Sequence, residues 1–171
     1  MSALHYYFAN KEELFIAAFA MEFQRVAEQR NQSVQDIEIL SLADLVRGYI
    51  TPLLAGDGES DNRDFLRLQA RALDDPQVAM HVFNRVVLPS TQPYLTALQA
   101  FFPKTGRGDL VRCFRNMTWA VGFALIDPLY EALTDESPYP KGPRKTRALI
   151  DLMVKYHTAG ILAVTSRTAK S

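Results

Sequence analysis

Apolar residues recur at helical spacing along almost the whole chain, and this periodicity constrains the fold more than any other feature. One short stretch shows the i, i+3, i+4, i+7, i+8 pattern of a single helix face: Leu42, Leu45, Val46, Tyr49 and Ile50. No stretch of strict period-two alternation bounded by hairpin dipeptides is present. The sequence therefore predicts an all-α fold, a helical bundle of about six or seven helices.

Capping residues and prolines divide this pattern into segments. Asn10, with Glu13 three residues later, forms a variant of the capping box and should start a helix that runs to about residue 32. A second helix should begin at Ser41 and end or kink at Pro52. Asp75 followed by Pro76 predicts another start. The remaining helices are expected over residues 63–73, 76–88, 92–102, 109–133 and 144–165, with a break or bend at Pro89 and Pro93 and an N-cap at Asp109.

The last two of these helices, over 109–133 and 144–165, are apolar on more than one face. A helix without a polar face is buried in a core or against another subunit. Two such helices predict a four-helix interface between two copies of the chain; alternatively, both fill the core of one monomer. The residues expected at the interface are Ala120, Val121, Ala124, Leu125, Leu152, Tyr156, Ala159, Gly160 and Ala163.

Composition and motif searches argue against several functions. The 19 Lys+Arg balance the 19 Asp+Glu, which does not indicate a dedicated nucleic-acid binder. The histidines lie far apart with no cysteine or carboxylate at ligand spacing, so neither a metal site nor a cofactor is expected. Phosphate-binding loops, dinucleotide fingerprints and nucleophile motifs are missing. We therefore do not expect an enzyme.

The sequence also predicts a compartment. A single cysteine, Cys113, excludes an intramolecular disulfide, and a reducing cytoplasm is the simplest location. The longest uninterrupted apolar run, Trp119–Ile126, is far shorter than the ~20 residues that cross a bilayer. The first eight residues have no basic or apolar region typical of a signal peptide. We expect no membrane partner.

A small-molecule pocket between helices is the more plausible site, because bundles place apolar pockets with a few polar groups there. Asp127 follows eight apolar residues, as a buried acid would, but Asp127-Pro128 also fits a helix restart. Arg71 could meet an anionic ligand or pair with nearby acids. The candidate lining residues, which could equally be ordinary core, are Phe65, Leu68, Met80, Phe83, Met117, Trp119, Phe123 and Tyr130, with Arg71, His81, Asn116 and Asp127 as orienting groups.

The most specific local signal lies at the N-terminus, where residues 2–15 read SALHYYFANKEELF. This segment of about fourteen residues resembles the end of the DNA-binding region of TetR-family transcriptional regulators. In that family a recognition helix runs into an aromatic cluster and a turn, and Lys-Glu-x-Leu then opens the next helix. The resemblance implies that His5, Tyr6 and Lys11 contact DNA phosphates. Here His5 stands where tyrosine is usual, and Tyr7 where histidine is usual.

The resemblance also implies a homodimeric regulator, usually a repressor, that binds an operator and a small-molecule effector. Residues 1–10 would be a remnant of the helix-turn-helix domain, and 11–171 the ligand-binding and dimerisation domain. Three helices need roughly 40 residues, and only ten precede Lys11. A truncated sequence or wrong start site would explain this, and so would a genuine loss of the DNA-binding unit. The alternative function is therefore a stand-alone dimeric sensor or interaction domain without DNA binding.

Overall fold

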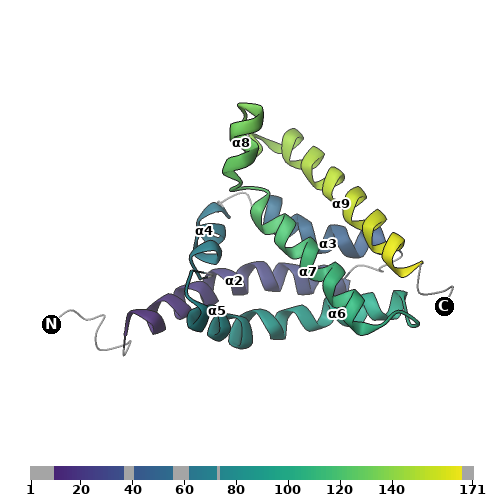
Figure 1. Ribbon diagram of the computed structural model, residues 1–171, viewed down its shortest axis with the longest axis horizontal. Helices are drawn as coiled ribbons and strands as arrows, with labels where there is room; N and C mark the ends of the chain where they lie inside the picture. The colour runs from purple at the N-terminus through teal and green to yellow at the C-terminus, as the bar shows by residue number, and fades with distance from the viewer. Residues whose placement is uncertain (1–9, 37–40, 56–61, 73, 167–171) are drawn as a thin grey trace.

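The computed structural model describes residues 10–36, 41–55, 62–72 and 74–166. Within these residues the fold is all-α without strands, as the periodicity predicts (Figure 1). The elements in chain order are α2 (Lys11–Asp36), α3 (Leu42–Ala55), α4 (Arg63–Ala72), α5 (Pro76–Val82), the π-helical η1 (Phe83–Val87), α6 (Leu88–Phe101), α7 (Arg107–Phe123), α8 (Pro128–Thr134) and α9 (Pro143–Thr165).

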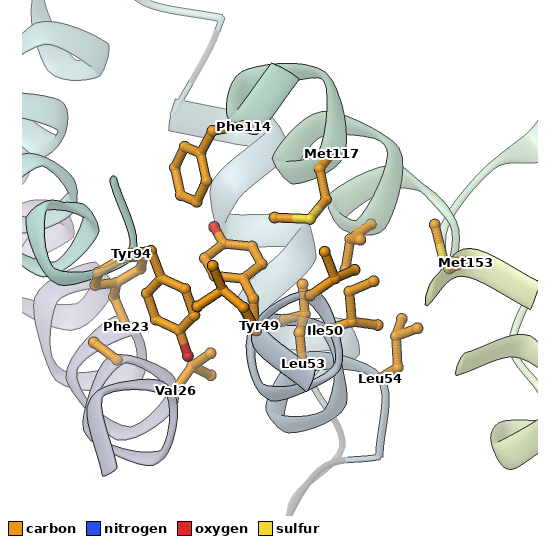
Figure 2. Close-up of a cluster of buried hydrophobic side chains, with 14 of the residues drawn as sticks. Phe23, Val26, Tyr49, Ile50, Leu53, Leu54, Tyr94, Phe114, Met117 and Met153 are labelled. Carbon is orange, nitrogen blue, oxygen red and sulfur yellow. The ribbon is translucent and has the colours of Figure 1, made fainter. Parts of the chain in front are cut away.

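Helix α3 lies at the centre of the bundle. It packs against α2, α6, α7 and α9, and the apolar stripe predicted for it is buried. Figure 2 shows how the neighbouring helices fill the space around Tyr49 and Ile50 of α3. Phe23 and Val26 enter from α2, Tyr94 from α6, Phe114 and Met117 from α7, and Met153 from α9. Because most helices contribute to this one cluster, α3 holds the bundle together through apolar burial.

Helix starts follow the predicted caps. The backbone N–H of Glu13 donates to Asn10 Oδ1 at 2.8 Å, and that of Asp44 donates to Ser41 Oγ at 3.2 Å. Asp75 Oδ1 accepts from the backbone N–H of Gln77 at 2.9 Å. These side chains satisfy N–H groups that have no partner inside the helix. Helix α2 continues to Asp36, beyond the predicted end near residue 32.

Pro52 does not end α3, which continues to Ala55. A proline inside a helix leaves the carbonyl four residues earlier without its N–H donor, here the carbonyl of Gly48. Ser33 Oγ of α2 lies 3.1 Å from this oxygen and 2.7 Å from the Arg30 carbonyl of its own helix, so its one hydroxyl proton is shared between the two acceptors. Of the two predicted effects of Pro52, an end or a kink of the helix, the end is wrong.

Of the break or bend predicted at Pro89 and Pro93, the break is wrong, because the backbone stays helical from Pro76 to Phe101. The π-helical segment η1 lies directly before Pro89, and the N–H of Leu88 donates to the Phe83 carbonyl five residues earlier. A widened turn of this kind accommodates a proline that cannot donate to the preceding turn. The helix therefore changes its winding here and continues.

The single helix predicted over 109–133 is split into α7 and α8. Helix α7 begins earlier than expected, at Arg107 with Gly106 rather than Asp109 as its N-cap. Asp127 caps α8, since its Oδ1 accepts from the N–H of Leu129 at 2.9 Å. The restart interpretation of Asp127-Pro128 is thus confirmed and the buried-acid interpretation is wrong.

Candidate functional site

A cavity of about 220 Å³ lies among α2, α3, α4, the α5–η1 segment and α7. Most of its lining is apolar: Phe19, Phe23, Tyr49, Leu53, Phe65, Ala72, Ala79, Met80, Val82, Phe83, Val87 and Trp119. Phe19 and Phe23 are one helical turn apart, so α2 presents both from one face. A mostly apolar hollow with a few polar groups is typical of small-molecule sites.

Three phenylalanines form an aromatic wall on one side of this cavity. The ring centroid of Phe65 lies 5.6 Å from that of Phe19 and 5.9 Å from that of Phe23. Phe19 and Phe23 stack at 5.8 Å with their planes 15° apart. These separations lie in the range preferred by aromatic pairs, so the rings hold one another in place.

The polar groups of the cavity are two arginines, a glutamine and a threonine. Arg30 is only 6% exposed, and its Nε donates to the Tyr49 carbonyl at 3.0 Å. Its guanidinium carbon lies 3.8 Å from the centroid of the Tyr49 ring. The guanidinium carbon of Arg115 lies 5.7 Å from the Phe83 ring and 5.2 Å from the Trp119 ring. Gln69 and Thr118 complete the set, and none of the described lining residues is acidic.

The structure brings four of the sequence-predicted pocket residues to this cavity: Phe65, Met80, Phe83 and Trp119. Met117 is buried in the hydrophobic core, and Leu68 is partly buried against that core. Arg71 and Phe123 are exposed, and Asn116 lines a groove between α7 and α9. Asp127 and Tyr130 line a separate groove beside α8. His81 points to solvent, with its Nδ1 3.0 Å from Glu12 Oε1.

Sequence reasoning did not assign the contribution of α2, because Phe19 and Phe23 were interpreted only as part of an apolar helix face. One signal could have distinguished this face from ordinary core. Arg30 is seven residues after Phe23, so helical spacing places a charged group on the apolar side. A charged residue on a buried face needs a partner or a ligand.

One face of α9 is apolar and exposed, and we call it the α9 face: Leu152, Tyr156, Ala159, Gly160 and Ala163. Leu152 is 64% exposed and Tyr156 72%. Contiguous apolar surface of this kind marks an interaction site. All five residues are among those predicted for a dimer interface.

The predicted interface residues of α7 lie elsewhere. Val121 and Leu125 are buried inside the monomer core, while Ala120 and Ala124 are half-buried. Both alanines border an open groove of about 830 Å³ beside α9. His157 reaches this groove too, and its Nε2 is buried with no hydrogen-bond partner in the described parts of the chain. Burial lowers the pKa of His157 below its ordinary value.

Of the expected phosphate contacts, only Lys11 belongs to the described residues; it is exposed in the first turn of α2. His5 and Tyr6 lie outside them. The described ranges contain no cluster of three or more potential metal ligands.

Helix α9 is long and apolar enough, by length and composition alone, to cross a membrane. This is weak evidence, because core helices of soluble proteins pass the same test. Its other face, with Ile150, Val154 and Ile161, is buried, and α9 packs on α3 and α7.

A family model described as "Tetracyclin repressor-like, C-terminal domain" matches residues 47–160. The matched segment runs from α3 through most of α9, so it includes the centre of the bundle, most of the cavity wall and most of the α9 face. No curated protein and no solved structure matches the chain. Since the matched residues make up more than half of the sequence, the chain belongs to the TetR family of regulators, as a TetR-like C-terminal domain.

Proposed function

We propose that this protein is a homodimeric transcriptional repressor whose affinity for operator DNA changes when a small molecule fills the cavity. The observation that carries this proposal is the course of α2. Its first turn bears the exposed Lys11, while its inner face lines the cavity with Phe19, Phe23 and Arg30. One continuous helix therefore joins the ligand site to a predicted DNA contact.

Lys11 is suited to a DNA phosphate for two reasons. Its ammonium group is exposed, and it lies at the N-terminus of a 26-residue helix, where backbone N–H groups favour an anion. In the TetR resemblance, His5 and Tyr6 supply further phosphate contacts from the segment before α2. Such contacts position a protein on DNA without reading its sequence.

A second contact connects the cavity wall to the same end of α2. His81 of α5 lies 3.0 Å from Glu12, the residue after Lys11. Its neighbours Met80 and Val82 line the cavity. A ligand that displaces α5 therefore acts on α2 through this pair as well as through the aromatic wall.

The dimer is proposed to form through the α9 face. The small residues Ala159, Gly160 and Ala163 allow a partner helix to approach closely, and Leu152 and Tyr156 supply apolar area. Two copies would then pack α9 against α9. A dimer fixes the distance between two DNA-reading units, and operator half-sites lie about one helical turn apart. A ligand that changes this distance lowers DNA affinity, with a coupling of about 1–3 kcal/mol.

DNA retention tests the proposal. The gene product, with any residues encoded upstream of Met1, should retain its own promoter fragment at low salt. Lys11→Ala should weaken binding to all DNA sequences alike. It should also make the slope of log K against log[salt] less steep by about 1, the share of one phosphate contact. Lys104→Ala, which changes an exposed lysine in the α6–α7 turn, is the matched control.

Failure to retain promoter DNA at low salt would contradict the repressor proposal. It would favour the alternative, a stand-alone dimeric sensor without DNA binding. TetR-family regulators are soluble proteins, and a cytoplasmic location accompanies either function.

A further inference from the structure

From the composition of the cavity we infer that the effector is a small organic monoanion, a carboxylate joined to a flat or flexible apolar body. This inference rests on the proposed function, since it assumes that the cavity between α2 and α7 is the effector site. It assigns the carboxylate to Arg30 and the apolar body to the aromatic wall.

Arg30 carries the charge argument. A buried arginine is stable when a carboxylate or another anion pairs with it. Arg30 is only 6% exposed, yet the described residues give it no carboxylate partner, only the Tyr49 carbonyl and the Tyr49 ring. The second arginine of the cavity, Arg115, stacks on rings and likewise forms no ion pair within the described part of the chain. The cavity therefore has two positive charges and no negative charge to balance them.

Two contacts of Tyr49 hold the guanidinium of Arg30 in place. Its Nε donates to the Tyr49 carbonyl at 3.0 Å, and one flat side lies over the Tyr49 ring at 3.8 Å. These two contacts fix the plane of the group and leave its terminal amino groups without a hydrogen-bond acceptor among the described residues. Two parallel N–H donors in one plane match the two oxygens of a carboxylate.

The other surfaces of the cavity determine the rest of the ligand. Phe19, Phe23 and Phe65 offer ring surfaces with few polar atoms, which suits a ring or a short alkyl chain. A cavity of ~150 Å³ lined by apolar side chains holds benzene, so about 220 Å³ admits one ring with its carboxylate. Gln69 lines the same space without a hydrogen bond to any described residue, and its amide can orient one further polar substituent.

Other ligand classes fit less well. A cation would meet two arginines, and a neutral molecule would leave the Arg30 guanidinium without an anionic partner. Inorganic phosphate would pair with the arginines but would leave the aromatic wall empty. A monoanion with an apolar body satisfies both parts of the cavity.

The test compares matched acids and amides on the 171-residue chain. Trp119 is the only tryptophan and lines the cavity, so its fluorescence reports occupancy. Benzoate is titrated against benzamide, hexanoate against hexanamide, and inorganic phosphate is titrated alone. We expect at least one acid to bind at least about tenfold more tightly than its amide, because a charge-assisted hydrogen-bonded pair replaces a neutral one. We expect phosphate alone to leave the fluorescence unchanged at the same concentrations.

Arg30→Met should abolish the preference for the acid, while Arg85→Met, which removes an exposed arginine of η1 outside the cavity, should retain it. The wild-type comparison needs no variant, so it decides the question even if Arg30→Met does not fold. Equal binding of acids and amides would overturn the anion assignment while leaving the cavity as the effector site. No change of Trp119 fluorescence with any probe would overturn the inference as well. The promoter-retention test contains no acid, so the failure of either test is distinguishable from that of the other.

Discussion

Ser33 Oγ lies 3.1 Å from the carbonyl oxygen of Gly48, the oxygen that Pro52 leaves without its helical donor. The same Oγ lies 2.7 Å from the Arg30 carbonyl, so one hydroxyl of α2 contacts carbonyl oxygens of both helices. Tyr94 joins the same cluster, because its Oη lies 2.8 Å from Ser33 Oγ and donates to the Arg30 carbonyl at 2.6 Å. The packing of α2 on α3 and α6 is therefore specified by hydrogen bonds as well as by apolar contact.

Ser33→Ala should lower the free energy of unfolding by about 1–2 kcal/mol, because it removes the hydroxyl that contacts the Gly48 and Arg30 carbonyls and Tyr94 Oη. In a Pro52→Ala background the loss should be smaller by about 1 kcal/mol, since an alanine at this position restores the helical N–H. Urea denaturation of the two single variants and the double variant measures this coupling. Ser90→Ala is the control, because Ser90 bonds only the Val87 carbonyl within its own helical segment. Additive effects of Ser33→Ala and Pro52→Ala would contradict a hydrogen bond between Ser33 and the Gly48 carbonyl.

Gly48→Ala should destabilise the protein by about 1–3 kcal/mol through overpacking. A Cβ added to Gly48 would lie only 2.6 Å from Ser33 Oγ, so α2 and α3 could not keep their separation. Gly108→Ala is the matched change in the first turn of α7, where an added Cβ meets nothing within 4 Å. It should leave the stability unchanged or raise it by up to about 1 kcal/mol. Thermal unfolding of both variants checks the contrast, and equal melting temperatures would rule out a close contact at Gly48.

Gly160→Gln should weaken the proposed dimer strongly while leaving the monomer folded. An added Cβ at Gly160 meets nothing within 4 Å inside the monomer, but a polar side chain there would obstruct a close helix pair. Sedimentation velocity at micromolar concentration should show a dimer for the wild-type chain and a monomer for the variant. Arg147→Gln changes an exposed residue on another side of α9 and should remain dimeric. A wild-type monomer at this concentration would exclude the α9 face as a stable interface.

Stability should fall as the pH rises from about 10 to about 12. Burial raises the pKa of Tyr94 from the ordinary 10.0 to about 12. As the pH rises, the unfolded chain therefore loses the Tyr94 proton before the folded chain does. The stability that the protonated Tyr94 contributes to the folded state is fully present below pH 10 and lost by pH 12. Within that window the free energy of unfolding should fall by about 1.4 kcal/mol per pH unit from this group.

The comparison with Tyr94→Phe isolates this effect from other titrating groups. Urea denaturation at pH 9, 10 and 11 should show a smaller decrease for Tyr94→Phe than for the wild type. Tyr130→Phe, which changes a half-exposed tyrosine on α8, should follow the wild-type curve. A Tyr94→Phe variant with the full wild-type pH dependence would mean that Tyr94 does not titrate differently on folding.

Local features of this fold were predictable because they depend on neighbouring residues. Asn10, Ser41 and Asp75 cap helices by bonding N–H groups two or three residues away, and the sequence contains both partners. The stripe of α3 is buried as its spacing predicts. The all-α class follows from the same periodicity.

Features that depend on other helices were not predictable from one helix. Pro52 stays inside α3, and the hydroxyl nearest to the carbonyl that it leaves without a helical donor belongs to Ser33 of another helix. Helix α7 has two apolar faces, and its sequence alone does not tell which one packs against the monomer core. Val121, which was predicted at the dimer interface, is buried in that core. The cavity likewise combines residues from several helices. Arg30 could therefore be recognised as a cavity residue only once its position beside Tyr49 and the phenylalanines was known.

The hydrogen bonds of Ser33 and Tyr94 hold α2 at one end, close to Arg30, and the other end of the helix carries Lys11. A helix rises about 1.5 Å per residue, so roughly 28 Å separate the fixed point from Lys11. In the proposed mechanism the helix pivots about this point, which adjoins the cavity. A tilt of roughly 4° about this pivot moves Lys11 by roughly 2 Å. Small displacements beside Phe19 and Phe23 would thereby be multiplied along the helix.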